Sequence, residues 1–248
     1  MKASLFRAEL FRARRSRSTW ILPAVGAGFL GLSLLGNVSV EHTKLAQGRT
    51  TPVEASYYLI GLAFIMLLFS ALSGVLSVTS EYRSRSMGVS VLVTPSRTPI
   101  LMAKAKVAAL MGALYGLLGV AVAWALSAVA LSARGDALVV SGRTVGLAVA
   151  IVSVVAVAGP WGTFVGAVVR SQLAAVIGTI VYVSMGEAAI LHYFPAVGRW
   201  LLGGAQAAVL ADPSVPERLG RLAGSGLLLG WIVATAAVAI PLFRNQEL

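Results

Sequence analysis

The sequence contains no cysteine and only two histidines in 248 residues. Without cysteine there is no disulfide and no thiolate nucleophile or metal ligand, and two histidines alone do not make a typical zinc or haem site, so we expect no metal. Charged residues are scarce as well, at 12% of the chain, whereas a soluble domain has about 25%. So few charges cannot cover a surface that faces water, and the sequence therefore predicts an integral membrane protein.

The chain is instead rich in apolar residues, with a hydrophobic share of 58% and a mean hydropathy of +0.86. A bilayer core needs about 20 apolar helical residues per crossing. Six stretches of that kind occur, and Glu187 is the only carboxylate inside any of them. We predict an all-α membrane protein with a head (1–19), a six-helix transmembrane domain (20–243) and a tail (244–248). The predicted spans are about 20–40, 57–78, 107–131, 145–169, 173–191 and 224–243.

Charge of one sign is also in short supply, with 9 Asp and Glu against 20 Lys and Arg, which gives a net charge of +11. In a membrane protein such an excess marks the cytoplasmic ends of the spans, so we expect no nucleic-acid partner. Most basic residues fall in the head and in the connection after the second span, which predicts a plasma-membrane protein with both termini in the cytoplasm. The predicted cytoplasmic residues are Lys2, Arg7, Arg12, Arg14, Arg15, Arg17, Arg83, Arg85, Arg97, Lys104, Lys106, Arg170 and Arg244.

The head has the pattern of an amphipathic helix. Apolar residues recur at three- and four-residue steps from Ala3 to Ala13, while arginines occupy the other faces. A basic amphipathic helix lies on a membrane surface or against a partner. We therefore predict Arg12, Arg14 and Arg15 at the membrane interface; the alternative is a solvated orientation signal with no partner.

The connection after the second span reads SEYRSRSMGVSVLVTPSRTPILMAKAK (80–106). It is polar at first and then apolar between Gly88 and Pro95, in a segment too short to cross a bilayer. The motifs Glu81-Tyr82-Arg83, Ser86-Met87 and Leu-Val-Thr-Pro-Ser-Arg (92–97), followed by Lys104, resemble the cytoplasmic signature of type-2 ATP-binding-cassette (ABC-2) permeases. Members of that family also begin with a basic amphipathic head and have six spans. Arg85 departs from the pattern, since the family often has glycine there.

The resemblance implies that this connection is a coupling helix that docks onto a separate ATPase subunit. It also implies that two permease copies, identical or different, work together. The positions that it implies for ATPase coupling are Glu81, Tyr82, Arg83, Arg85, Ser86, Thr94, Pro95 and Arg97. We also expect Arg97 and Lys104 to anchor this connection to the lipid headgroups.

No ATP site is apparent in the chain itself. A phosphate-binding loop needs a glycine-rich backbone followed by Lys and then Ser or Thr, but the four lysines precede Ala, Leu, Ala and Val. We therefore expect this chain to carry no cofactor and no enzymatic activity, with ATP and Mg bound by the partner ATPase.

Two features lie toward the predicted outer side. The segment 197–211 is apolar and flanked by Pro195 and Pro213; it is too short for a span and is interpreted as a re-entrant or interfacial hairpin, or else as an ordinary surface loop. The resemblance implies that it caps the exit of the pathway. Glu187 is a candidate for gating or substrate contact, because a charge inside a span usually faces a cavity or partner. The alternative is a hydrated structural carboxylate.

Small residues within the spans predict close helix packing. The glycine pairs 112/116, 162/166 and 226/230 have the spacing that permits helices to approach closely. Gly159-Pro160 lies in the middle of the fourth span, where proline removes a backbone hydrogen bond and favours a bend.

Together these patterns predict the membrane-spanning subunit of an ATP-driven exporter of a hydrophobic or amphipathic solute, such as a drug, antibiotic, peptide or lipid-like molecule. One alternative is an ion-coupled secondary transporter that uses Glu187 as its proton site. Another is a non-transporting membrane scaffold or immunity subunit.

Overall fold

The computed structural model describes residues 2–84, 97–213, 215 and 218–244. Over these residues the fold is all-helical, and six helices are long and apolar enough to cross a membrane, which confirms the predicted class and number of spans. Each of the six contains one of the predicted stretches. The spans are Arg17–Ala46, Pro52–Tyr82, Thr98–Ser132, Gly142–Val169, Gln172–Tyr193 and Arg221–Arg244.

The individual helices subdivide some of these spans. The second span consists of α3, a short 3₁₀ turn (η1) and α4, and the fifth consists of α8, a π-helical turn (η2) and α9. The bounds are α1 (Lys2–Arg15), α2 (Arg17–Ala46), α3 (Pro52–Gly61), η1 (Leu62–Ile65), α4 (Met66–Ser84), α6 (Arg97–Ser132), α7 (Gly142–Val169), α8 (Gln172–Val181), η2 (Tyr182–Gly186), α9 (Glu187–Tyr193), α10 (Pro195–Gly198), α11 (Leu202–Leu210) and α12 (Arg221–Arg244).

Local capping explains why the second span begins before its apolar stretch. The Thr51 hydroxyl accepts the backbone N–H of Glu54, and the Glu54 carboxylate accepts the N–H of Thr51 at 3.0 Å. Pro52 occupies the first helical turn, where its missing N–H costs nothing. This reciprocal cap satisfies backbone donors that a helix start otherwise leaves unpaired, so the helix extends into polar sequence.

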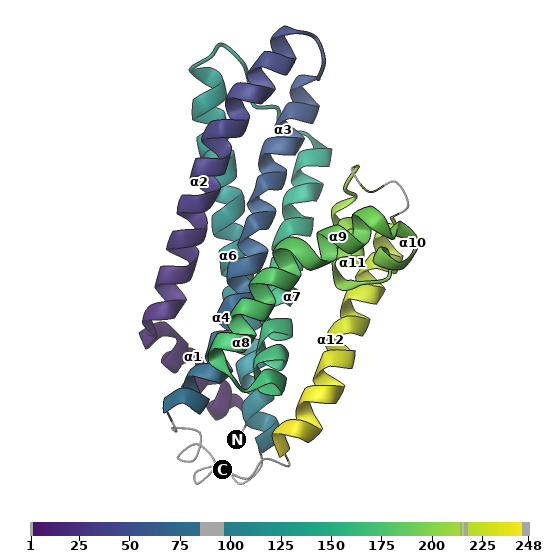
Figure 1. Cartoon of the computed structure of the whole chain (residues 1–248). Coiled ribbons are helices and arrows are strands. Elements are labelled where there is room, and N and C mark those ends of the chain that lie inside the picture. The colour runs from purple at the N-terminus through teal and green to yellow at the C-terminus, as the bar shows by residue number, and fades with distance from the viewer. Residues whose placement is uncertain (1, 85–96, 214, 216–217, 245–248) are drawn as a thin grey trace.

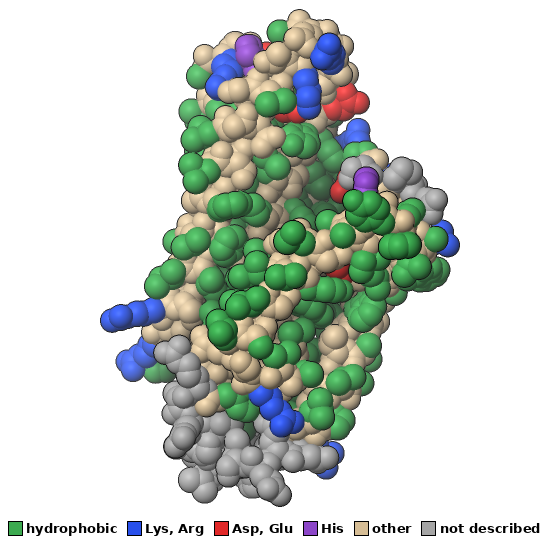
Figure 2. Space-filling model, in the orientation of Figure 1, with side chains coloured by type: hydrophobic (Ala, Val, Ile, Leu, Met, Phe, Trp, Pro, Cys, Tyr) green, Lys and Arg blue, Asp and Glu red, His purple; other side chains and the backbone are tan. Residues whose placement is uncertain are grey.

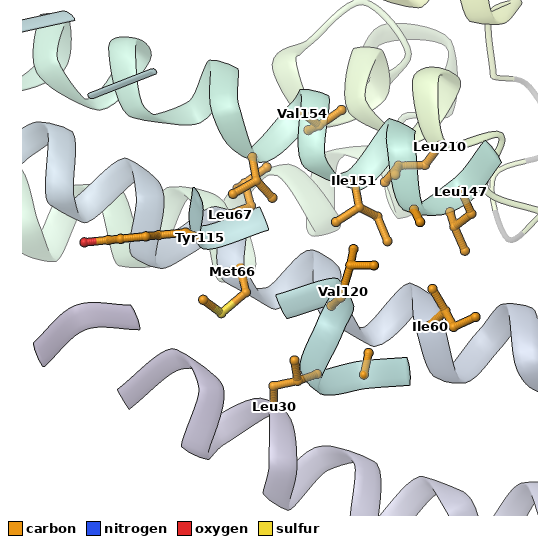
Figure 3. Packing of buried hydrophobic residues seen from close by; sticks show 14 of the residues in the cluster. Leu30, Ile60, Met66, Leu67, Tyr115, Val120, Leu147, Ile151, Val154 and Leu210 are labelled. Carbon is orange, nitrogen blue, oxygen red and sulfur yellow. The ribbon is translucent and has the colours of Figure 1, made fainter. Parts of the chain in front are cut away.

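The centre of the molecule is formed by α4, α6 and α7, which pack extensively on one another. Helix α2 covers α4 and α6 on one side, and α12 lies on the other side against α7 and α11 (Figure 1). Figure 3 shows Leu30 of α2, Met66 of α4 and Val120 of α6 among the buried apolar residues of this core. The shared apolar interior positions the two ends of the bundle, where the polar groups lie.

Glycines allow the three central helices to approach at backbone distance. A Cβ added to Gly162 would lie 2.0 Å from the carbonyl oxygen of Ala71, and one added to Gly74 would lie 2.0 Å from that of Gly159. The predicted pairs 112/116 and 162/166 lie in these contacts, but Gly226 and Gly230 have open space around them. Helix α7 continues through Pro160, from Gly142 to Val169.

Charged side chains gather toward the two ends of the molecule and around the corner formed by α9, α10 and α11, and the remaining surface between the ends is largely apolar (Figure 2). Helix α1, the end of α4, the start of α6 and the end of α12 lie at one end, which we call the head end (Figure 1). The α2–α3 and α6–α7 connections lie at the opposite, far end. An apolar band between two polar ends is the arrangement that a membrane-spanning bundle requires.

Candidate functional site

Four charged side chains from three helices meet at the head end. The Lys104 ammonium on α6 donates to Glu81 Oε1 on α4 at 2.6 Å and to Glu9 Oε2 on α1 at 2.9 Å. Arg12 donates to Glu9 Oε1 at 3.3 Å and also to Glu81. We call these four residues the ion cluster.

Burial makes the ion cluster costly to disrupt. Lys104 is 3% exposed and Glu81 is 5% exposed, so neither charge is solvated by bulk water. The ion cluster is accessible to solvent at Arg12, since the Arg12 side chain is 54% exposed. Two cations face two carboxylates, and this mutual pairing is the condition under which buried charges are tolerated.

The apolar face of α1 brings Glu9 and Arg12 into the ion cluster. Phe6, Leu10 and Ala13, which form the apolar stripe predicted for the head, pack against the main core. Ser16 is non-helical and separates α1 from α2, so the head is a helix distinct from the first span. The ion cluster therefore connects the head directly to the end of α4 and to the start of α6. These two helix ends are the two ends of the connection 80–106.

The structure changes the interpretation of two predicted site residues. The sequence predicts Lys104 at the lipid headgroups, but its side chain is buried and donates to the carboxylates of Glu81 and Glu9. Glu81 is interpreted from the sequence as an ATPase contact, whereas its carboxylate points inward to Lys104 and Arg12. Both residues join segments of this chain to one another.

The other predicted coupling residues lie around this site. Tyr82 is partly buried against a second apolar cluster that includes Val78, Leu101 and Phe243. Arg83 lies in the last turn of α4 and Arg97 begins α6. The coupling-helix prediction, with Arg85, Ser86, Thr94 and Pro95, falls outside the described residues.

The arginines at the end of α1 face outward. Arg14 and Arg15 are exposed, and the Arg15 guanidinium lies 4.5 Å from the centre of the Phe11 ring. Trp20 donates its indole N–H to the Arg14 carbonyl at 2.9 Å. Exposed arginines beside exposed aromatic rings are typical of a membrane interface.

Sequence reasoning missed Glu9. It is the only acidic residue in the head, and it stands three residues before Arg12, a spacing at which helical side chains meet. That pairing was recognisable in the sequence. The contact of Glu9 with Lys104, 95 residues away, was not.

Glu187 lies at the start of α9, in a second polar site. It is 5% exposed, and the Tyr182 hydroxyl donates to its Oε1 at 2.6 Å. Its other partner is the backbone of Gly203, in the first turn of α11. Because the first N–H groups of a helix lack intrahelical partners and carry positive partial charge, the carboxylate caps α11. A Cβ at Gly203 would lie 2.6 Å from Glu187 Oε2.

The apolar segment 197–211 forms part of α10 and all of α11. Most side chains of α11 are buried, and the helix packs on α12, α7 and α9. Tyr57 of α3 donates its hydroxyl to the Leu210 carbonyl at 2.9 Å. The segment is therefore a packed, helical part of the bundle and not an ordinary surface loop.

His42 has a hydrogen-bond partner at the far end of the bundle. His42 Nδ1 lies 2.7 Å from Asp136 Oδ2 at the far end, where it joins α2 to the connection after α6. Among the residues that the structure describes, no group of three or more His, Asp or Glu side chains is arranged to hold a metal ion.

No protein-family model matches the chain, and no curated protein matches it.

Proposed function

We propose that the chain is the permease subunit of an ATP-driven exporter of the ABC-2 type. Its working form is a dimer of permeases in the plasma membrane, bound to nucleotide-binding ATPase subunits on the cytoplasmic side. The observation that carries this proposal is the ion cluster, which ties α1, α4 and α6 together at the end of the molecule with the basic excess.

The orientation follows from the charge distribution. The head end contains Arg7, Arg14, Arg17, Lys106 and Arg244, and its acidic residues Glu9 and Glu81 are already neutralised in the ion cluster. The basic residues of the far end are interspersed with Glu41, Glu54 and Asp136. Because basic residues next to spans are retained in the cytoplasm, the head end and both termini are cytoplasmic.

The ion cluster supports a route by which a push at the head end moves the spans. When ATP closes the ATPase subunits, they displace the connection between α4 and α6. Since Lys104 and Arg12 hold Glu81 and Glu9 together, α1, α4 and α6 respond as one body. At Gly74 and Gly162 the backbones of α4 and α7 are in direct contact. Helix α7 therefore moves together with α1, α4 and α6.

The transported solute is hydrophobic or amphipathic, because uncharged apolar helices line most of the bundle. On the outer side, α10 and α11 form the re-entrant cap of the exit. Glu187 fixes the start of α11 to α9, so its role in gating is to hold this cap in place.

The test is transport in inside-out vesicles that contain the chain and its ATPase, measured with a panel of amphipathic fluorescent dyes. We expect uptake of at least one dye that requires Mg-ATP and persists when a protonophore collapses the proton gradient. Uptake that follows the proton gradient without any ATPase would instead favour the ion-coupled alternative. Stable partner binding without flux of any dye would favour the scaffold or immunity alternative.

A further inference from the structure

A small cavity lies where α11 packs against α12 and α7 (Figure 1). Five elements contribute to its walls, through Leu67 of α4, Trp161 of α7, Val183 of η2, Gln206 of α11 and Leu228 of α12. The centre of a water molecule has about 10 Å³ of free space in it, which is close to the minimum for one water, about 10–15 Å³. The cavity shown by the structure therefore has room for about one water-sized group.

The Gln206 amide faces this cavity without a partner. Gln206 is 6% exposed, and its amide forms no hydrogen bond to any residue that the structure describes. Leaving a buried polar group unpaired costs about 1–3 kcal/mol. Gln206 therefore does not stabilise this form of the bundle, and its amide is available to a group that enters the cavity.

The polar groups next to the cavity are already engaged. The Tyr182 hydroxyl donates to Glu187 at 2.6 Å, and the Tyr182 ring stacks on Trp161 with the ring centres 5.7 Å apart. Among the described residues that line the cavity, none is charged. The site therefore suits a neutral hydrogen-bonding group and not an ion.

The walls of the cavity differ in how firmly they are held. In the most apolar stretch of α7, 50% of the residues are buried, compared with 17% in that of the fifth span and 17% in that of α12. The fifth span also contains the π-helical turn η2, a geometry that occurs frequently at functional sites. Movement of η2 or α12 away from α7 separates few buried residues, and it enlarges the cavity beneath α11.

We propose that this cavity is a solute site directly beneath the cap formed by α10 and α11. The solute is uncharged and carries a hydrogen-bonding group, such as a hydroxyl, that pairs with the Gln206 amide. Its apolar part lies along Leu228 and Ile232 when α12 and η2 move outward. Apolar and aromatic walls with one or two polar groups are typical of ligand sites. This inference rests on the proposed export function, and it narrows the solute to neutral molecules.

Binding of two neutral probes to the purified full chain in detergent tests the site without ATP or an ATPase. The probes 9-anthracenemethanol and 9-ethylanthracene are nearly equal in size, but only the first carries a hydroxyl. Equilibrium dialysis against protein-free micelles, with anthracene fluorescence as the readout, gives the affinity of each probe for the chain. We expect the alcohol to bind about tenfold more tightly, which corresponds to about 1.4 kcal/mol and is within the range of one hydrogen bond.

Three variants locate the binding. Gln206→Leu has nearly the same size without the amide, so it should bind the two probes equally and unfold at the same temperature or higher. Ile232→Trp fills the cavity from a partly buried position on α12, and should weaken the binding of both probes at least tenfold. Gln172→Leu makes the same substitution at the start of α8, outside the cavity lining, and should bind as the unmodified chain does.

A Gln206→Leu variant that still prefers the alcohol, or binding that Ile232→Trp leaves unchanged, would overturn the proposal. So would an unmodified chain that binds neither probe, since the cavity then admits no more than a water. Uptake of the alcohol driven by Mg-ATP is measured separately in vesicles. Binding with the preference intact but without uptake would contradict the export function alone, whereas uptake that Gln206→Leu does not change would contradict this site alone.

Discussion

The ammonium of Lys104 lies 2.6 Å from Glu81 Oε1, and the two residues are located on either side of the connection between α4 and α6. Both side chains are buried. A buried ion pair contributes little net stability relative to an apolar pair, but it becomes costly when one partner is removed. The contact therefore specifies how α4 and α6 meet at the head end, where we propose that the ATPase acts.

The first prediction concerns this pair. Lys104→Ala leaves Glu81 and Glu9 buried without an ammonium, so we expect a loss of about 3–5 kcal/mol in stability. Lys106→Ala is the matched control, because that side chain is exposed and should change stability by less than about 0.5 kcal/mol. Thermal unfolding of the purified chain in detergent measures both. Equal decreases in stability for Lys104→Ala and Lys106→Ala would show that Lys104 is not held in the ion cluster.

A second prediction concerns the outer member of the ion cluster. Arg12 is half exposed, so water screens its interaction with the carboxylates. Arg12→Gln should therefore lower the unfolding temperature far less than Lys104→Ala does. If Arg12→Gln were the more damaging of the two, the burial of Lys104 would not be the dominant factor.

A third prediction tests the glycine contacts between α4 and α7. Gly162→Ala places a methyl group 2.0 Å from the Ala71 carbonyl oxygen, and the helices must separate, at a cost of about 1–3 kcal/mol. Gly146→Ala on the same helix meets nothing within 4 Å, and should be neutral or slightly stabilising because alanine favours helices. Detergent unfolding curves of the two variants provide the comparison. A Gly162→Ala chain as stable as Gly146→Ala would argue against the close packing.

Glu187 provides a fourth prediction. Glu187→Gln keeps an oxygen that can accept the Tyr182 hydroxyl and the Gly203 N–H, so both the fold and ATP-driven dye transport should be retained. Glu187→Ala removes both interactions, and should lower stability by about 1–3 kcal/mol, the cost of leaving buried polar groups unpaired. A Glu187→Gln variant that folds normally but no longer transports would identify the carboxylate as a proton site.

The spans could be predicted from the sequence because their cause is local. A stretch of about 20 residues without charge has no stable alternative to a membrane helix. Their ends were less predictable, since polar residues extend the helices. Helix α2 continues to Ala46 because Glu41 pairs with Lys44 one turn later, at 2.6 Å, and His42 pairs with Asp136.

The ion cluster could not be predicted, because it depends on contacts between distant parts of the chain. In the sequence, Lys104 is only one of many basic residues near the end of a span. Basic residues at such positions generally contact lipid headgroups. Only the packing of α1 on α6 places Glu9 beside Lys104. In the same way, the role of Glu187 depends on where α11 begins, which no periodicity in the sequence determines.

An ATPase partner bound at the head end is the central element of the proposed function. We would purify the tagged full chain from its native membranes, identify bound proteins by mass spectrometry and measure Mg-ATP hydrolysis. Three forms are compared: the unmodified chain, Arg83→Ala at the end of α4, and Arg49→Ala at the far end. We predict that a nucleotide-binding subunit and its activity accompany the unmodified chain and Arg49→Ala but are lost from Arg83→Ala. A chain that purifies without any ATPase and transports alone, or an ATPase that all three forms retain equally, would contradict the account.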